Sequence, residues 1–301
     1  MAERMVRSEG GQVPAPVTAR LIRIAHSPDP DDAFMFCGLA TGAVPSGPYE
    51  LVHELGDIES LNRRALQGEL ELTALSFAAY PYLADRYQLL SCGASVGDGY
   101  GPILIAREPG TEIGGARIAI PGERTTAVLA LKLYARAVAP DVALQTLVVP
   151  FADIPAAVAR GDADLGLVIH EGQLTYADQG LALVVDLGRY WQERKGLPLP
   201  LGGNAVRRDL GPQVAIDLAR LLQRSIEWGL AHRDRALDYA RGFGRGLSTV
   251  RTDRFVGMYV NDWTRDLGDR GRGAVADLLR EGHAAGLTPA LPPLDFVPTE
   301  P

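Results

Sequence analysis

The stretch from residue 117 to residue 140, RIAIPGERTTAVLALKLYARAVAP, contains one complete strand–turn–helix unit. Its first four residues are typical of a short buried strand, and the pair Pro121-Gly122 marks a turn. Apolar residues then recur at helical spacing, and LQTLVVP (144–150) is strand-like again. Because strands alternate with helices here, the stretch predicts an α/β fold with mainly parallel sheets.

The same alternation continues on both sides of this stretch. On the N-terminal side, strands with helices between them are predicted at 21–28, 49–55 and 70–80. On the C-terminal side, a helix is followed by the strand LGLVIHEG (165–172). From about residue 212 onward the chain is nearly all helical. The sequence therefore predicts an α/β protein with a helical C-terminal part.

Two lobes are expected, because the pattern restarts after Gly110 and the strand-like segment 197–210 can carry the chain back. Two lobes joined by two crossovers enclose a cleft, which is the usual place for a small-molecule site. We predict a flexible leader at 1–20, a first lobe made of 21–108 and 207–301, and a second lobe at 109–206.

Composition and charge exclude several classes of protein. The net charge of −7 argues against nonspecific binding to nucleic acid, which needs a basic surface. No apolar run approaches the roughly 20 residues of a membrane span, and the N-terminus lacks the apolar core of a secretory signal, so we expect a cytoplasmic protein. Cys37 and Cys92 lie in apolar surroundings without the spacing of metal ligands. We therefore expect two buried thiols and no metal site.

The start of the first predicted helix, SPDPDD (27–32), is a candidate binding site. Helix N-termini attract anions, but three acids in one turn repel them, so we expect Ser27, Asp29 and Asp31 to contact hydroxyl or carbonyl groups of a ligand. The alternative is that the acids only cap the helix, and we expect this role for Asp32. Acids so close together also require compensation by a bound proton, a basic partner or hydrogen bonds from hydroxyl groups of the ligand.

A second helix start follows the strand at 117–120. Thr125 and Thr126 offer hydroxyls and free N–H groups there, an arrangement suited to a carboxylate, although a plain helix cap explains them too. Ser76 ends another buried strand. Its hydroxyl either faces the cleft or caps the helix that follows.

His170 comes at the end of the apolar run 165–169. Ligands of α/β sheets bind beyond the carboxyl ends of strands, and an imidazole with a pKa near 6.5 suits proton removal at neutral pH. Glu171 either orients that imidazole or faces solvent. The alternative is a buried packing histidine. His26 is a weaker candidate of the same kind, and His53 is interpreted as a surface residue.

Six segments carry a resemblance to a known family: SPDPDDAFMFCGL (27–39), DIESLNRRAL (57–66), the segment 72–107, PGERTTAVL (121–129), the segment 162–211 and ALDYAR (236–241). Together they resemble the 1,4-dihydroxy-6-naphthoate synthases of the futalosine pathway of menaquinone biosynthesis. The resemblance covers about 21–290, and its most specific part runs from IHE to GLPLPLG (169–202). The SPxPxD motif is shared with the related chorismate dehydratases. Family members often have SPCPNDTF, where this chain has Asp29, Asp31 and Ala33.

The resemblance implies the two-lobed fold of type II periplasmic binding proteins. It also implies a lyase that converts cyclic dehypoxanthine futalosine, a small-molecule carboxylate, into 1,4-dihydroxy-6-naphthoate without a metal or redox cofactor. The catalytic histidine of the family falls on His170, and its substrate-binding residues fall on Ser76, Thr125 and Thr126. Two alternatives stay open: a chorismate dehydratase-like enzyme of the same pathway, and a solute-binding protein without catalytic activity.

Overall fold

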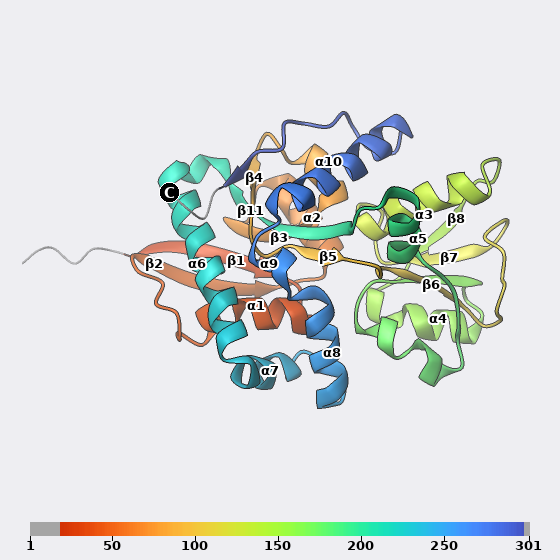
Figure 1. Cartoon of the computed structure of the whole chain (residues 1–301), viewed down its shortest axis with the longest axis horizontal. Coiled ribbons are helices and arrows are strands. Elements are labelled where there is room, and N and C mark those ends of the chain that lie inside the picture. The colour runs from red at the N-terminus through yellow and green to blue at the C-terminus, as the bar shows by residue number, and fades with distance from the viewer. Residues whose placement is uncertain (1–18, 298–301) are drawn as a thin grey trace, which may run out of the picture.

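The computed structural model describes residues 19–297, which form two lobes, each built around one β-sheet (Figure 1). The strands of the first-lobe sheet are β1 (Arg20–His26), β2 (Tyr49–Leu55), β3 (Leu72–Ser76), β4 (Tyr87–Leu90), β5 (Ser95–Gly97), β11 (Leu199–Arg207) and β12 (Phe296–Val297). Their order is β12-β4-β11-β3-β1-β2, with β5 beside β11. The strands of the second-lobe sheet are β6 (Ile103–Ala106), β7 (Arg117–Ile120), β8 (Gln145–Val148), β9 (Leu165–Val168) and β10 (Ala182–Asp186). Their order is β10-β6-β9-β7-β8.

Helices connect these strands and then dominate the C-terminal part. The helices up to residue 195 are α1 (Pro30–Ala40), α2 (Ile58–Gln67), α3 (Thr126–Val138), α4 (Ile154–Arg160) and α5 (Leu187–Lys195). The later ones are α6 (Pro212–Ala231), α7 (Arg233–Arg241), α8 (Thr249–Tyr259), α9 (Asp262–Arg265) and α10 (Gly268–Ala284). The two-lobed α/β fold with a helical C-terminal part is thus confirmed, although the short β12 after these helices was not predicted.

The lobe boundaries differ from the predicted ones at both crossovers. β6 pairs with β9 and β10, so the chain enters the second lobe between β5 and β6 and not at residue 109. β11 pairs with β3, β4 and β5, so the chain is back in the first lobe at Leu199 and not at residue 207. Periodicity identifies a strand but not the sheet that it joins. Residues 1–18 of the predicted leader lie outside the described residues, and Arg20 is the first residue of β1.

Both sheets are mixed, whereas mainly parallel sheets were predicted. β1, β2 and β3 are parallel neighbours, as are β7, β8 and β9. The crossover strands β6 and β11 instead run antiparallel to their neighbours. These strands arrive from the other lobe, so they enter their sheets in the direction opposite to the strand–helix–strand units.

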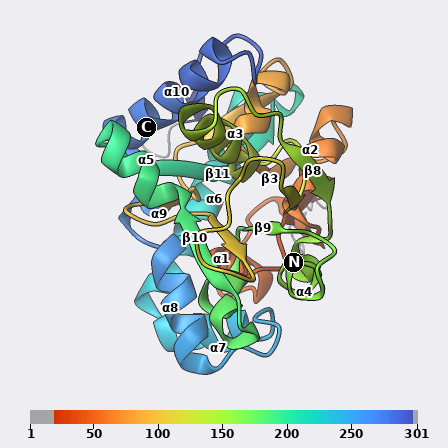
Figure 2. The ribbon, with the colours of Figure 1, turned by 90° about the vertical axis from the view of Figure 1, so that its right-hand side faces the viewer.

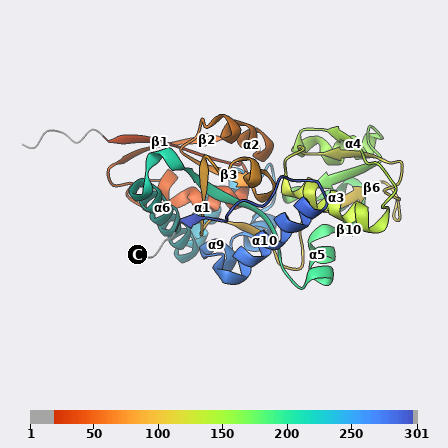
Figure 3. The same ribbon diagram turned by 90° about the horizontal axis from the view of Figure 1, so that it is seen from above.

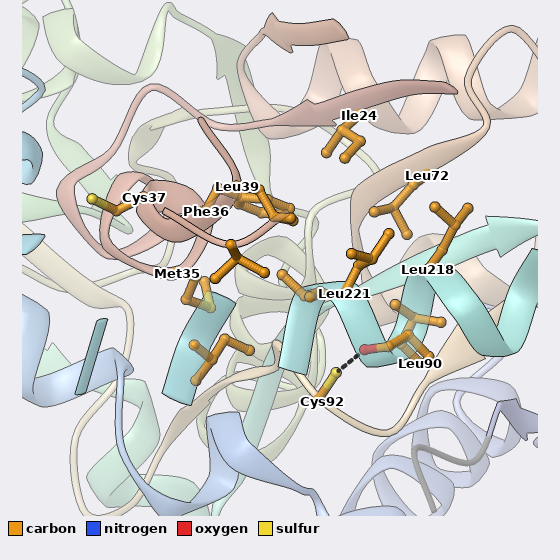
Figure 4. Close-up of a cluster of buried hydrophobic side chains, with 14 of the residues drawn as sticks. Ile24, Met35, Phe36, Cys37, Leu39, Leu72, Leu90, Cys92, Leu218 and Leu221 are labelled. Atoms are coloured by element: carbon orange, nitrogen blue, oxygen red, sulfur yellow. Dashed lines mark hydrogen bonds between the residues drawn. The ribbon is translucent and has the colours of Figure 1, made fainter. Parts of the chain in front are cut away.

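The core of the first lobe lies where α1 is buried between the sheet and α6 (Figure 4). Its apolar side chains include Ile24, Phe36, Leu72, Leu218 and Leu221. Both cysteines are free and buried in this lobe, as predicted, and the Cys92 thiol donates to the Ala219 carbonyl over 3.6 Å. Packing on all sides fixes α1, and with it the SPDPDD turn at its start.

The C-terminal helices cover two opposite edges of the molecule. α10 lies at one edge and reaches from the first lobe to α3 (Figures 1 and 3), whereas α7 and α8 lie at the other (Figures 1 and 2). Between residues 19 and 297, no helix is long and apolar enough to cross a membrane. The same residues contain no group of three or more His, Cys, Asp or Glu side chains placed to hold a metal ion.

Candidate active site

A cleft of about 720 Å³, including the part that is open to solvent, lies between the lobes. Six of the seven predicted site residues line it: Ser27, Asp29, Asp31, Ser76, Thr125 and Thr126. The seventh, His170, does not line it, although the preceding residue, Ile169, does. The structure therefore brings together residues that are up to one hundred positions apart in the sequence, at the strand ends of both sheets.

The SPDPDD turn does not use its acids as we predicted. Asp29 occupies the N-cap position of α1 but makes no side-chain capping bond. Asp32 does not cap the helix either, because its Oδ2 atom accepts a 2.7 Å hydrogen bond from the Ser27 N–H, which precedes the helix. That bond ties the end of β1 to the first turn of α1. The expectation that Asp32 is the capping residue was therefore wrong.

The three acids are compensated by two of the three expected means. Asp29 Oδ1 lies 2.9 Å from Nη2 of Arg245, which supplies a basic partner. Burial raises the pKa of Asp32 to about 6, despite hydrogen bonds from Ser27 that lower it. Burial also raises the pKa of Asp31 well above its usual range, and the neighbouring charges of Asp32 and Asp29 raise it further. A bound proton in this pair thus relieves the repulsion.

Ser76 faces the cleft and does not cap the 3₁₀ helix Phe77–Tyr82 that follows it. Asn62 of α2 holds it on two sides. Its amide donates to the Ser76 hydroxyl oxygen over 3.1 Å, and its carbonyl accepts from the Ser76 N–H over 2.9 Å. The hydroxyl proton of Ser76 is then left to donate to a ligand.

Thr125 is the N-cap of α3, as the simpler interpretation of the sequence has it. Its hydroxyl donates to the Gly122 carbonyl over 3.0 Å and accepts from the Val128 N–H over 3.3 Å. Thr126 accepts a 3.1 Å hydrogen bond from the N–H of Ala78 in the first lobe, so its own hydroxyl proton stays available. The N–H groups of Thr126 and Ala127 begin the helix and have no acceptor within it. An anion in the cleft can therefore be held by these three donors.

His170 is buried behind the cleft wall, with 4% of its surface exposed. Its Nε2 atom contacts the Phe151 carbonyl at 2.9 Å, and Nδ1 accepts from the Gly172 N–H at 3.2 Å. Because a carbonyl can only accept, Nε2 carries the proton and Nδ1 the lone pair of the neutral ring. The Phe151 ring packs against the imidazole at 4.6 Å between centroids.

Charged groups near His170 determine its pKa. Burial lowers this pKa, but Glu171, whose Oε2 lies 3.3 Å from Nδ1, and then Asp29 raise it, so that the pKa ends above 6.5. Burial likewise raises the pKa of Glu171, but His170 and Arg245 outweigh it and bring the pKa to about 2. Glu171 is therefore a buried carboxylate beside the imidazole and not the solvent-facing neighbour that we considered.

The other two histidines of this part of the chain do not reach the cleft. His26 is stacked on Phe36, with 4.4 Å between ring centroids, and its Nδ1 contacts the Ser27 carbonyl. His53 packs edge-on against both rings and is half-buried, so its interpretation as a surface residue was wrong. Burial lowers the pKa of each of these histidines to about 4.

The cleft residues that were missed from the sequence include one amide and two aromatic side chains. Asn204 of β11 donates to the Gly93 carbonyl over 2.8 Å, while its Oδ1 atom is buried without a partner and is free to accept from a ligand. Phe255 and Tyr259 of α8 form an aromatic wall. Helical spacing in the sequence assigns Phe255 and Tyr259 to a buried face, but only the return of the chain to the first lobe places that face on the cleft.

Direct contacts join the two lobes beside the cleft. Glu59 of α2 accepts from the Arg124 N–H over 3.1 Å. Tyr259 and Gln173 exchange hydrogen bonds of 3.0 and 3.1 Å. The backbone at Gly122 comes so near Glu59 that a Cβ atom would lie 2.4 Å from Cγ of that side chain. Glycine is therefore required at this contact.

Comparison with known proteins gives matches over almost the whole chain. A family model described as menaquinone biosynthesis matches residues 22–284. A 1,4-dihydroxy-6-naphthoate synthase of Thermus thermophilus is 43% identical over 276 residues, which are 92% of this chain and 99% of that protein. A synthase of the same name from Streptomyces coelicolor is 37% identical over 277 residues, which are 92% of this chain and 98% of that protein.

Solved structures support the fold. A protein of Archaeoglobus fulgidus superimposes with a TM-score of 0.84 at 45% identity, covering 89% of this chain and 98% of its own. An alkanesulfonate-binding protein of Xanthomonas axonopodis, bound to MOPS, has a TM-score of 0.66 at 14% identity and covers 92% and 96%. A Candida albicans protein with the periplasmic-binding-protein fold has a TM-score of 0.68 at 12% identity and covers 91% and 92%. The predicted periplasmic-binding-protein-like fold is thus confirmed.

Proposed function

The chain belongs to the menaquinone biosynthesis family, and on that premise we propose that it is a lyase that converts cyclic dehypoxanthine futalosine into 1,4-dihydroxy-6-naphthoate. The observation that most supports this proposal is the make-up of the cleft. Donors from α3 line its second-lobe side, polar acceptors and acids line its first-lobe side, and aromatic side chains come from α8. The substrate has a carboxylate and a polar sugar-derived part, and the remaining part becomes the aromatic product. These three parts match the three surfaces.

The carboxylate of the substrate binds at the start of α3 in this proposal. The N–H groups of Thr126 and Ala127 and the Thr126 hydroxyl are the donors that the fold leaves available there. The partial positive charge at the helix N-terminus adds to their attraction for an anion. Thr125 takes part indirectly, because its cap holds the helix start in shape.

The sugar-derived part of the substrate binds on the first-lobe side. Ser76 donates a hydroxyl hydrogen bond, and the free Oδ1 atom of Asn204 accepts one from a substrate hydroxyl. Asp31, with its raised pKa, can donate or accept in the same place. The Ser27 and Asp29 part of the turn borders this surface. The acids are thereby kept away from the carboxylate end of the substrate.

His170 acts as the general base in the proposed reaction. The imidazole removes a proton next to the carbonyl group of the substrate, and the electron pair of that C–H bond then drives ring opening and elimination of the sugar-derived fragment. Both ring nitrogens make hydrogen bonds while the imidazole is buried behind the cleft wall. The base must therefore free its Nδ1 lone pair from the Gly172 N–H, release the Phe151 carbonyl from Nε2, and turn toward the cleft, which the adjacent Ile169 already lines.

Closure of the lobes over the substrate excludes water from the proton transfer and elimination. The contacts of Glu59 with Arg124 and of Tyr259 with Gln173 are the interactions that would hold this closed form. We place the reaction in the cytoplasm.

Two incubations of the purified protein test this proposal against its alternatives. With cyclic dehypoxanthine futalosine, we expect a fluorescent product that has the mass of 1,4-dihydroxy-6-naphthoate. With chorismate, we expect no turnover. Conversion of chorismate alone would support the dehydratase alternative, and tight binding of either compound without any product would support the solute-binding alternative.

A further inference from the structure

Arg245 lies in the segment between α7 and α8 and has an unusual backbone conformation. Its φ angle of 45° makes it the only residue other than glycine with a positive φ among residues 19–297. A left-handed conformation is costly for a residue with a Cβ atom and persists where surrounding contacts hold it. We therefore expect contacts of its side chain to hold this conformation.

The Arg245 guanidinium connects the two lobes. On the first-lobe side, Nη2 lies 2.9 Å from Asp29 Oδ1 and donates to the Pro28 carbonyl over 3.2 Å. On the second-lobe side, Nη1 donates to Glu171 Oε1 over 2.5 Å, and the group lies 4.6 Å from the centre of the Phe151 ring. Both sets of contacts can exist together only while the lobes are closed.

The Glu171 carboxylate is shared between Arg245 and the proposed base. Its Oε1 atom accepts from Arg245, while its Oε2 atom lies 3.3 Å from His170 Nδ1 and has no hydrogen-bond donor. Glu171 is therefore placed to accept a hydrogen bond from Nδ1 when that atom carries a proton, and Arg245 holds the carboxylate in that place. Phe151 touches both the guanidinium and the imidazole, so it links the same two residues.

We propose that Arg245 is a positioning residue that, on lobe closure, joins Asp29 to Glu171 and so fixes the charge and orientation around His170. This proposal rests on the proposed function, since it assigns Arg245 a role through the base. It also gives a reason for the acid at position 29, because Asp29 is the first-lobe anchor for the guanidinium.

The charged groups that face His170 are Glu171 beside it, Asp29 before α1 and Arg245 before α8. Without Arg245, two carboxylates would face the imidazole and no cation would offset them. The imidazolium form would then be favoured, and the pKa of His170 would rise. A base that is protonated at neutral pH cannot remove a proton, so activity would survive only at higher pH.

The test compares Arg245→Ala and Arg245→Lys with Arg251→Ala as the matched control. Arg251 also forms an ion pair between α8 and the second lobe, with Asp178, but it does not touch Glu171. We expect the acid limb of the kcat/KM profile to move up by about one pH unit or more in Arg245→Ala, which corresponds to a change of about tenfold in proton affinity. Arg245→Lys should restore most of the shift, and Arg251→Ala should leave the limb unchanged.

The titration of His170 in the substrate-free protein separates this proposal from the proposed function. It is followed by NMR with labelled histidine and needs no turnover. A higher pKa of His170 in Arg245→Ala, and a lower one in Glu171→Gln, would support the coupling even if no naphthoate were formed. Titration curves that are identical in the wild type and both variants would overturn it, as would an equal shift in Arg251→Ala. If Arg245→Ala does not fold, Glu171→Gln and Arg245→Lys decide the question alone.

Discussion

Replacing Asp32 with asparagine should stabilise the protein at alkaline pH more than at acidic pH. Asp32 is buried at the start of α1, where it accepts from the Ser27 N–H, and burial raises its pKa from 3.8 to about 6. As the pH rises, the unfolded chain loses this proton first, so the folded state loses stability between about pH 4 and pH 6 and regains none above it. Asparagine keeps the acceptor for Ser27 but carries no charge at any pH.

The size of the effect follows from the shift of about two pKa units. At 1.36 kcal/mol per unit, the ionised form costs the folded state about 3 kcal/mol. Roughly half of this, about 1.5 kcal/mol, is expected to develop between pH 5 and pH 8. In a chain of 301 residues that corresponds to a difference of about 2–3 °C in Tm.

Thermal and urea unfolding of wild type and Asp32→Asn at pH 5 and pH 8, at one ionic strength, measures this difference. The control is Asp262→Asn, because the Asp262 side chain is 99% exposed and should make the same small contribution at both pH values. The reasoning is refuted if the stability difference between wild type and Asp32→Asn is the same at pH 5 and pH 8.

Three other changes have definite expected results. Thr126→Val should raise KM roughly tenfold and change kcat less, because a donor to the substrate carboxylate is lost. An unchanged KM in steady-state assays would mean that Thr126 only accepts the hydrogen bond from Ala78 and does not bind the substrate. Gly122→Ala should lower kcat at least about tenfold in a folded protein, since its Cβ would lie 2.4 Å from Glu59 Cγ and oppose closure; X-ray scattering should show a more open form, and a wild-type rate would argue against it. His53→Phe should stabilise the protein at pH 5 more than at pH 7.5 in thermal unfolding. Burial lowers the pKa of His53 to about 4, so the wild type loses stability as the pH falls from 6.5 toward 4; a pH-independent effect would contradict this.

The sequence predicts the strand ends well because short apolar runs and turn residues are local features. Ser76, Thr125 and Thr126 line the cleft next to strand ends that such local features mark. His170 follows the end of β9 by two residues, but the local pattern gives no information on the Phe151 carbonyl, which its ring contacts behind the cleft wall.

Long-range partners could not be predicted. The acids of the SPDPDD turn indicated that compensation was required, but not by which group. Arg245 lies in the glycine-rich segment RGFGRGL, which looks like an ordinary turn, and only the fold brings it to Asp29 and Glu171. The lobe to which β6 belongs was missed for the same reason, since pairing with β9 is a tertiary contact.

The turnover of His170→Asn and His170→Ala with saturating cyclic dehypoxanthine futalosine tests the central claim most directly. The measurement is the rate of naphthoate formation, with circular dichroism and Tm as checks on folding. If His170 is the base, kcat should fall by roughly 10² or more in both variants while the fold is retained. A folded variant that turns over at a rate near that of the wild type would contradict the account and leave His170 as a buried packing residue beside the cleft.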